Sequence, residues 1–469
     1  MRRYDFPAPL LLLATLACSD AVREAGSGAQ AVEGPTLGVI VVVDQLRADL
    51  LDRYDDLFTG GFRVLLDGGA VFTNATHDHA STSTAPGHAT LATGVHPRTH
   101  GISGNSWFER VGDRWRSMYA VADTSVEILA DPGLPGRSPA NLRADGIADW
   151  LATARPDARI VAISRKDRGA IPLAGRAGQD VYWLALEDGV GGFTTSTYYH
   201  QALPAWVRGA NAALGPGLWG DTVWSFAAAD SLRSRARRDD HPGEADGVHT
   251  TFPHRAHVEV DMTDRGAWGD WLENAPPPDA AVTTLALEAL RARELGVRGT
   301  VDMLALSYSS TDGVGHRFGP LSQEQLDNLL ELDRELGRLM EALDAEVGEG
   351  SWVLALSADH GVLDLPEARM EAELPAGRLG AAELAAADAA LAGVGVGDDG
   401  VAVAEALRAG GIVADAYPFA ELRAPGEVRD SFMPLYRNGW VEDRVLSFPG
   451  LAVEVRLPEG TYGEEFGTG

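Results

Sequence analysis

Three aspartates in this sequence follow apolar segments that are rich in β-branched residues. They are Asp44, Asp312 and Asp359. A histidine accompanies two of them, since His316 follows Asp312 by four residues and His360 comes directly after Asp359. Carboxylate oxygens and imidazole nitrogens are typical ligands of catalytic zinc. A single Asp in such a place is an ordinary helix cap, but three of them, two with a histidine, predict a metal site.

A threonine provides a candidate nucleophile. Thr84 opens the segment Thr84-Ala-Pro-Gly-His88, and a run of helical character follows. At a helix start a hydroxyl lies near unpaired backbone N–H groups, which favour anions such as a phosphoryl group. Taken alone, Thr84 is better interpreted as ordinary helix capping, with Pro86 in the first turn. Beside a two-metal site, which can hold the attacking and leaving oxygens of an in-line displacement, it predicts attack on phosphorus.

A pair of cations follows another apolar segment. Residues 159–164 lead into Arg165-Lys166-Asp167-Arg168. In an extended segment, residues two apart point the same way, so Lys166 and Arg168 are expected to share a face. For a lone pair of cations, a solvated basic turn is the ordinary explanation.

The apolar segments themselves are predicted to be strands that are buried on both faces, as in a parallel sheet. They cover residues 36–43, 159–164, 302–308 and 352–357. Amphipathic helices are predicted over 279–295 and 322–343, the second with Ser322 and Gln325 as a capping box. This alternation predicts an α/β fold with a largely parallel central sheet flanked by helices. Ligands bind beyond the carboxyl ends of such strands, where Asp44 and its counterparts are expected.

Weaker local patterns predict further elements. They are a helix over 62–70, a short strand over 71–75, a helix over 138–154 and helical structure over 376–411.

Composition sets limits on the function. The 469 residues are 45% hydrophobic, which is enough for a sizeable core, and the formal net charge is −29. Such an acidic chain argues against a nucleic-acid-binding surface, which needs basic patches. An anionic substrate is still compatible with it, because metals or a few local cations reverse the field inside a pocket.

The N-terminus resembles an export signal. Residues 1–18 combine a basic start with an apolar run that is too short to span a membrane. Cys18, the only cysteine, lies where a bacterial lipoprotein signal places its lipidated cysteine, although Thr15 occupies a position usually held by Leu. Lipidation at Cys18 and simple cleavage are left as equal alternatives. Residues 19–35 form a flexible tether, so we expect an exported protein, either periplasmic or lipid-anchored to the cell envelope.

Taken together and in this order, the motifs resemble the alkaline phosphatase superfamily, and within it the branch with a Thr nucleophile. That branch includes Thr-type bacterial alkaline phosphatases and the nucleotide pyrophosphatase/phosphodiesterases. The motifs are Val41-Val-Val-Asp44, Thr84-Ala-Pro-Gly-His88, Gly104-Asn105, Lys166-Asp-Arg168, Thr311-Asp-Gly-Val-Gly-His316 and Ala358-Asp-His-Gly361. The resemblance implies one catalytic domain over 36–469, with inserted cap segments around 170–275 and 370–450.

The resemblance also implies a role for each matching residue. One zinc ion is assigned to Asp44, Thr84, Asp359 and His360. A second is assigned to Asp312, His316 and a third His near the C-terminus. Lys166, Arg168 and Asn105 correspond to the residues that contact the non-bridging phosphate oxygens in the monoesterase branch. A dianionic monoester presents more charge than a diester, which is the physical reason for the extra cations.

One ligand of the family pattern is missing. The family places its last His in a Gly-Thr-Gly-His-Gly turn, whereas this chain ends in Phe466-Gly-Thr-Gly469 and has no His after His360. We therefore expect an incomplete C-terminus and a second zinc site that lacks its third protein ligand. The alternative is that another histidine supplies it, from the set His241, His249, His254 and His257.

The sequence thus favours a zinc-dependent phosphate monoester hydrolase that forms a phospho-Thr84 intermediate on small-molecule phosphate monoesters. The first alternative is a phosphodiesterase or nucleotide pyrophosphatase of the same superfamily. A second, from another class, is a catalytically impaired surface binding protein. A sulfatase is disfavoured, because Thr84 stands where a sulfatase needs a Cys or Ser.

Overall fold

The computed structural model describes residues 34–129, 133–186, 191–218, 220, 222–395, 397, 399–424, 426–446 and 449–462. The expected signal segment with Cys18, nearly all of the expected tether and the closing turn Phe466–Gly469 lie outside the described residues.

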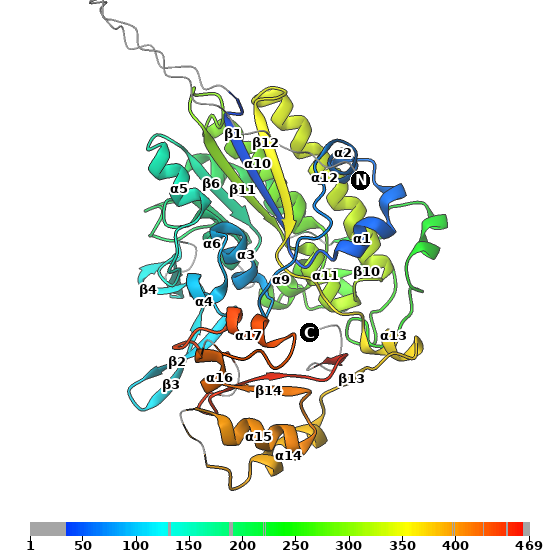
Figure 1. Ribbon diagram of the computed structural model, residues 1–469. Coiled ribbons are helices and arrows are strands. Elements are labelled where there is room, and N and C mark those ends of the chain that lie inside the picture. The colour runs from blue at the N-terminus through cyan, green and yellow to red at the C-terminus, as the bar shows by residue number, and fades with distance from the viewer. Residues whose placement is uncertain are drawn as a thin grey trace, which may run out of the picture.

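A six-stranded sheet forms the centre of the molecule (Figure 1). In spatial order its strands are β12 (Trp352–Ala358), β1 (Leu37–Val43), β11 (Asp302–Tyr308), β6 (Ile160–Ser164), β7 (Asp180–Ala185) and β8 (Gly192–Thr194). The first five are parallel to one another, and β8 pairs antiparallel with β7. The predicted α/β fold with a largely parallel sheet is confirmed.

Strand register brings three carboxyl ends to the same level of this sheet. Val43, the last residue of β1, pairs with Tyr308 of β11 on one side and with Ala358 of β12 on the other. The residues that follow these strands therefore emerge side by side. Their proximity is fixed by the hydrogen-bonded ladder and not by the loops alone.

Helices cover both faces of the sheet (Figure 1). On one face, the alternate residues Val39, Val41 and Val43 of β1 belong to a core cluster with α10 (Pro277–Ala292) and α12 (Gln323–Glu346). On the opposite face, Val42 belongs to a second cluster with α5 (Ile147–Ala154) and α6 (Asp167–Ala174). Each buried Val or Leu contributes about 1.5–3 kcal/mol, so these two layers hold the strand ends firmly.

A smaller group of elements lies beyond the carboxyl ends of the sheet (Figure 1). There β14 (Asp415–Pro418) pairs antiparallel with β15 (Val453–Arg456), and α15 (Val401–Gly410) packs on this pair. The hairpin of β2 (Ser106–Val111) and β3 (Arg114–Tyr119) lies beside it, and Phe108 of β2 bridges to Val445.

Several local predictions differ from the structure. Residues 71–75 form no strand, and the predicted helix over 138–154 begins only at Ile147. The helical structure predicted over 376–411 is present as two helices, α14 (Ala381–Leu391) and α15. Strand β12 is an edge strand, so only one of its faces packs on the core. Val353 on its other face is 57% exposed, and the prediction of burial on both faces is wrong for this strand.

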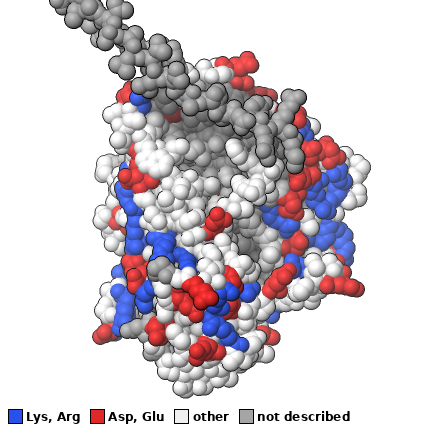
Figure 2. All heavy atoms as spheres, in the orientation of Figure 1, with Lys and Arg blue, Asp and Glu red and all other residues white. Residues whose placement is uncertain are grey.

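Basic and acidic side chains are intermixed on the face shown in Figure 2. Among the described residues, no helix combines the length and the apolar character that a membrane crossing requires.

The N-terminus of helix α12 contains half of the predicted capping box, and it yields a stability prediction. Ser322 Oγ accepts the Gln325 N–H at 3.0 Å, whereas the Ser322 N–H donates to the Gly319 carbonyl and the Gln325 side chain donates to the Thr311 carbonyl. Replacing Ser322 by Ala should lower the free energy of unfolding by about 1 kcal/mol, because one buried N–H loses its acceptor. The measurement is the midpoint of denaturant unfolding. Ser234→Ala, at an exposed position, is the control and should leave the midpoint nearly unchanged. Equal midpoints for wild type and Ser322→Ala would contradict the capping role.

Candidate active site

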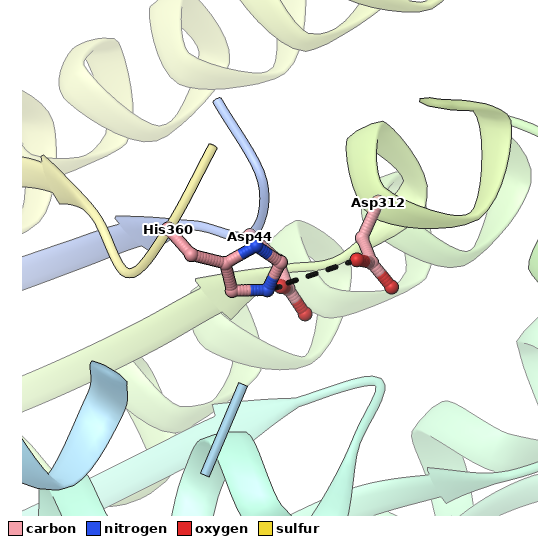
Figure 3. Close-up of side chains that lie close together, drawn as sticks. All are labelled: Asp44, Asp312 and His360. Atoms are coloured by element: carbon pink, nitrogen blue, oxygen red, sulfur yellow. Dashed lines mark ion pairs between the residues drawn. The ribbon is translucent and has the colours of Figure 1, made fainter. Parts of the chain in front are cut away.

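The carboxyl edge of the sheet brings the predicted carboxylates together, and Figure 3 shows two of them, Asp44 and Asp312, beside His360. Asp44 follows β1, Asp359 follows β12, and Asp312 lies in the first turn of α11 (Ser310–Phe318). Asp44, Asp312 and His360 each offer one donor atom, and these atoms all lie within 4.8 Å of one another. His360 Nε2 is 3.1 Å from Asp44 Oδ1. The three strand ends therefore form one buried cluster of oxygen and nitrogen donors.

Helix α11 is positioned by a buried acceptor. The carboxylate of Asp279, in the first turn of α10, accepts the N–H of Ser309 at 2.8 Å and of Ser310 at 3.2 Å. These are unpaired donors at the start of α11, and Asp279 satisfies them from another element. Burial raises the pKa of Asp279 to about 7, against the opposing effect of these N–H groups. The start of α11, and with it Asp312, is thereby fixed to the sheet.

Gln45 is a site residue that the sequence analysis missed. Its backbone N–H donates to Asp359 Oδ1, and its side-chain Nε2 donates to Asp312 Oδ1, both at 3.0 Å. Its backbone has φ +65°, a left-handed conformation that costs a non-Gly residue of order 1–3 kcal/mol. Such strain is tolerated where the surrounding contacts impose it. In the sequence, only the position next to Asp44 could have indicated this role.

Lys166 reaches into the middle of the carboxylates. Its ammonium lies 2.6 Å from Asp44 Oδ2, also pairs with Asp312, and donates to Thr84 Oγ1 at 3.2 Å. The residue is 4% exposed. A buried ammonium is stable there because it balances charges that would otherwise repel each other.

Arg168 makes different contacts from Lys166. The backbone between them is not the extended segment that the spacing predicts, since α6 begins at Asp167. The Arg168 guanidinium donates to the hydroxyl of Tyr119, the last residue of β3, at 3.2 Å. The Tyr119 hydroxyl in turn donates to the Asp167 carboxylate. The Arg168 side chain is thus held by Tyr119, which is itself bonded to Asp167.

The electric field of the cluster favours cations. Burial alone would raise the pKa of Asp44, but Lys166 and His360 outweigh it and hold that pKa well below its usual value. The pKa of Asp312 is likewise lowered, since Lys166 and His316 overcome burial and the charge of Asp44. For His360, burial opposes the charged form, yet the carboxylates, Asp359 foremost, raise its pKa to about 10.

Thr84 and Asn105 lie next to each other at the start of α3 (Thr84–Thr93). Thr84 is 2% exposed, and its Oγ1 is 3.5 Å from Asp44 Oδ1. Asn105 Oδ1 accepts the N–H of Ala85 at 2.8 Å, which places its amide beside the candidate nucleophile. The structure thus brings the predicted hydroxyl, amide, ammonium and carboxylates into one place.

His316 lies at the periphery of the cluster. Its Nε2 is 3.2 Å from Asp312 Oδ1, and its side chain is 45% exposed. Three of the alternative histidines have carboxylate partners elsewhere, His241 with Glu371, His249 with Asp246 and His254 with Glu259 and Glu324. Within the described part of the chain, the group of donors suited to a metal contains none of these alternatives.

The donors present fit a divalent metal ion. Asp359 Oδ2 is buried and has no hydrogen-bond partner, a costly state for a carboxylate oxygen unless a cation approaches it. Two carboxylates and an imidazole converge beside it, and this combination of hard oxygen and borderline nitrogen donors suits zinc. The residues that could hold metal are Asp44, Thr84, Asp312, His316, Asp359 and His360.

The fold and this site define an α/β protein with a metal-type donor cluster and a hydroxyl at the carboxyl edge of its sheet. The sequence pattern of the type I phosphodiesterase / nucleotide pyrophosphatase family matches residues 38–374. The chain belongs to this family, which is part of the alkaline phosphatase superfamily.

Two of the curated relatives are bacterial alkaline phosphatases. The chain is 34% identical over 357 residues to alkaline phosphatase PhoV of Synechococcus elongatus, which covers 75% of this chain and 63% of PhoV. It is 33% identical over 338 residues to alkaline phosphatase PafA of Elizabethkingia meningoseptica, covering 71% of this chain and 60% of PafA. The match thus spans less than two thirds of the length of either relative.

The crystal structure of PafA has the same fold. It superposes with a TM-score of 0.80 at 26% sequence identity, over 94% of this chain and 88% of the PafA chain. A PafA variant that is substituted at one threonine, one asparagine, one lysine and one arginine superposes equally well.

The raised pKa of His360 gives a pH-dependent prediction for this site. The His360 imidazole, with a pKa of about 10, must lose its proton before it can bind a metal ion. The apparent affinity for Zn2+ should therefore increase by about tenfold per pH unit between roughly pH 6 and 9. Chelator-buffered zinc titrations measure it. His360→Gln, which has no such proton, should show a flatter dependence. A flat profile in the wild-type protein would contradict the assignment of His360.

Proposed function

We propose that the protein is a zinc-dependent phosphate monoester hydrolase that acts through a covalent phospho-Thr84 intermediate. The observation that carries the proposal is the position of the Thr84 hydroxyl. It lies at the N-terminus of α3, 3.2 Å from the Lys166 ammonium and 3.5 Å from Asp44 in the metal-type cluster. The Lys166 ammonium, together with a metal ion bound in the cluster, would stabilise the Thr84 oxygen as an alkoxide, and the helix N-terminus favours the phosphoryl group that it attacks.

The relatives support this proposal. PhoV and PafA are named alkaline phosphatases. The residue types substituted in the PafA variant occur in the same order and at nearly the same spacing in this chain, as Thr84, Asn105, Lys166 and Arg168.

Thr84 forms and breaks bonds in two steps. In the first, Thr84 Oγ1 bonds to phosphorus while the ester P–O bond breaks. The hydroxyl proton passes to solvent, and the departing alcohol oxygen takes up a proton from water. In the second, a water oxygen bonds to phosphorus and loses a proton to solvent, the bond to Thr84 Oγ1 breaks, that oxygen takes up a proton from solvent, and inorganic phosphate leaves. Each step is an in-line displacement that needs charge stabilisation on both sides of phosphorus.

Residues of the cluster would hold two zinc ions, one on Asp44, Thr84, Asp359 and His360 and one on Asp312 and His316. Bound zinc supplies Lewis-acid chemistry that lowers the pKa of a hydroxyl and stabilises a leaving oxygen. The chain itself contributes orientation, since Gln45 bonds to carboxylates of both proposed groups.

Lys166, Arg168 and Asn105 favour a monoester substrate. A phosphate monoester carries two negative charges on its non-bridging oxygens, which the Lys166 ammonium beside Thr84 and the Arg168 guanidinium would neutralise. A phosphodiesterase or nucleotide pyrophosphatase is the second candidate, because the matching family carries that description. Comparing an aryl phosphate with an aryl phosphate diester as substrates separates the two. A surface binding protein without activity would turn over neither.

We also propose that the protein is exported and is either periplasmic or lipid-anchored to the cell envelope. The basic and apolar residues 1–18, which end in Cys18, support this proposal.

Removing the nucleophile tests the covalent mechanism. Thr84→Ala should abolish multiple turnover of an aryl phosphate but keep most of the bound zinc, because the carboxylate and imidazole ligands remain. Thr93→Ala, a buried threonine of the same helix whose hydroxyl donates to the Ala89 carbonyl, is the control and should stay active. Acid quenching of the wild-type reaction should reveal phosphothreonine at position 84 by mass spectrometry. Near wild-type turnover by Thr84→Ala would refute the mechanism.

Removing the cations tests the substrate class. Lys166→Ala and Arg168→Ala should each reduce kcat/KM for a monoester by roughly 10- to 150-fold, the equivalent of a charged contact of about 1.5–3 kcal/mol. Diester hydrolysis should fall much less, because a diester carries less charge on those oxygens. Arg155→Ala, an exposed arginine, controls for loss of a positive charge. Equal losses for both substrates would count against the monoesterase assignment.

A further inference from the structure

His88 is a buried histidine that no proposed ligand set includes. It lies in α3 one turn after Thr84, and its side chain is fully buried. Its Nδ1 is 2.8 Å from the Thr84 carbonyl oxygen and 3.0 Å from Asp359 Oδ2. Its Nε2 is 2.8 Å from Ser307 Oγ, near the end of β11. A single imidazole thus contacts the backbone of the nucleophile, a proposed metal ligand and the central sheet.

The contacts assign a proton to Nδ1. The Thr84 carbonyl oxygen and the Asp359 carboxylate are acceptors, so a nitrogen between them must carry the hydrogen. This N–H bonds to the Thr84 carbonyl, and Asp359 Oδ2 has no hydrogen-bond partner of its own. The N–H therefore attracts Asp359 Oδ2 electrostatically but does not form a hydrogen bond with it. A lone pair of that oxygen stays available to a cation. Ser307 Oγ can donate to Nε2 and hold the ring in this tautomer.

The imidazole has little freedom to move. A Cβ at Gly87 would overlap with the Asp359 carbonyl oxygen, so the backbone of α3 packs directly against Asp359. On the other side, a Cβ at Gly169 of α6 would lie 2.7 Å from Ser164 Oγ and 3.0 Å from Ser307 Oγ. Both helices approach this closely only because these positions are glycine.

An ordinary buried histidine would look different, and the same stretch of chain offers examples. His79 and His100 are also buried, and they bond to Thr90 and to nearby backbone groups. Burial lowers the pKa of both, as expected for neutral histidines in a packed interior. His88 differs from them because it contacts Thr84 and Asp359, which come from different elements of the proposed site.

We propose that His88 is a positioning residue, which fixes Asp359 relative to Thr84 so that the metal ligand and the nucleophile keep one geometry. This inference rests on the proposed function, since it assigns Asp359 to a metal and Thr84 to the attack. Groups that orient a ligating carboxylate typically change metal affinity or activity by roughly 10- to 100-fold when they are removed.

Two substitutions of His88 distinguish the contacts of Nδ1 from those of Nε2. In Asn the amide nitrogen occupies the place of Nδ1, whereas in Gln it reaches the place of Nε2. His88→Asn should keep the contact with Thr84 and Asp359, with zinc affinity and kcat within about threefold of wild type. His88→Gln should lose both by roughly 10- to 100-fold. KM for an aryl phosphate should change little in the zinc-saturated variants, because His88 does not touch the substrate.

The control is His100→Asn, which changes an equally buried imidazole outside the site. Chelator-competition titrations with Zn2+ and melting temperatures in EDTA are measured for every variant beside kcat. Loss of zinc affinity in His88→Gln, but not in His88→Asn or His100→Asn, supports the proposal. Equal zinc affinity and kcat in both His88 variants overturn it, as do equal losses in both. Because wild type is assayed in parallel, a wild-type protein without zinc or turnover would refute the proposed function instead.

Discussion

The structure of the site depends on compensating the repulsion between carboxylates that are buried together. Asp44, Asp312 and Asp359 lie out of water at one edge of the sheet, where like charges cannot persist without compensation. Lys166 and His360 provide that compensation in the free chain, as the lowered pKa of Asp44 and the raised pKa of His360 indicate. A site built this way is unfavourable for stability in itself and selects for bound cations. The apolar packing of the two core layers around the sheet offsets this unfavourable contribution to stability.

Much of this arrangement could be predicted from the sequence. An apolar run that ends in a carboxylate indicates both a buried parallel strand and the place where its side chain emerges, so the sheet, Asp44 and Asp359 followed from one signal. The Thr84 motif and the capping of α12 were also local. The division of the ligands between two zinc ions required the family resemblance. So did the roles of Asn105, Lys166 and Arg168, because a single amide or cation carries no signal of its own.

What could not be predicted depends on contacts between distant segments. Gln45 bonds to two carboxylates that lie about 270 and 310 residues further along the chain, and its left-handed backbone leaves no pattern in the sequence. The exposed face of β12 reflects its place at the sheet edge, which composition does not reveal. The start of α6 at Asp167 likewise depends on packing against β6 and β11 and not on the four polar residues alone.

The position of Lys166 connects the proposed metal site with the proposed substrate. Its ammonium is within reach of both Thr84 Oγ1 and the carboxylates, and any charge that neutralises Asp44 and Asp312 weakens its hold on them. In the proposed mechanism, metal binding and phosphate binding would therefore not be independent. A cation in the cluster would leave the ammonium free to interact with a phosphoryl oxygen at Thr84. The Arg168 guanidinium donates instead to the hydroxyl of Tyr119, which in turn donates to Asp167. In the proposed mechanism the two cations therefore differ, and the Lys166 ammonium would couple occupancy of the metal site to the environment of the Thr84 hydroxyl.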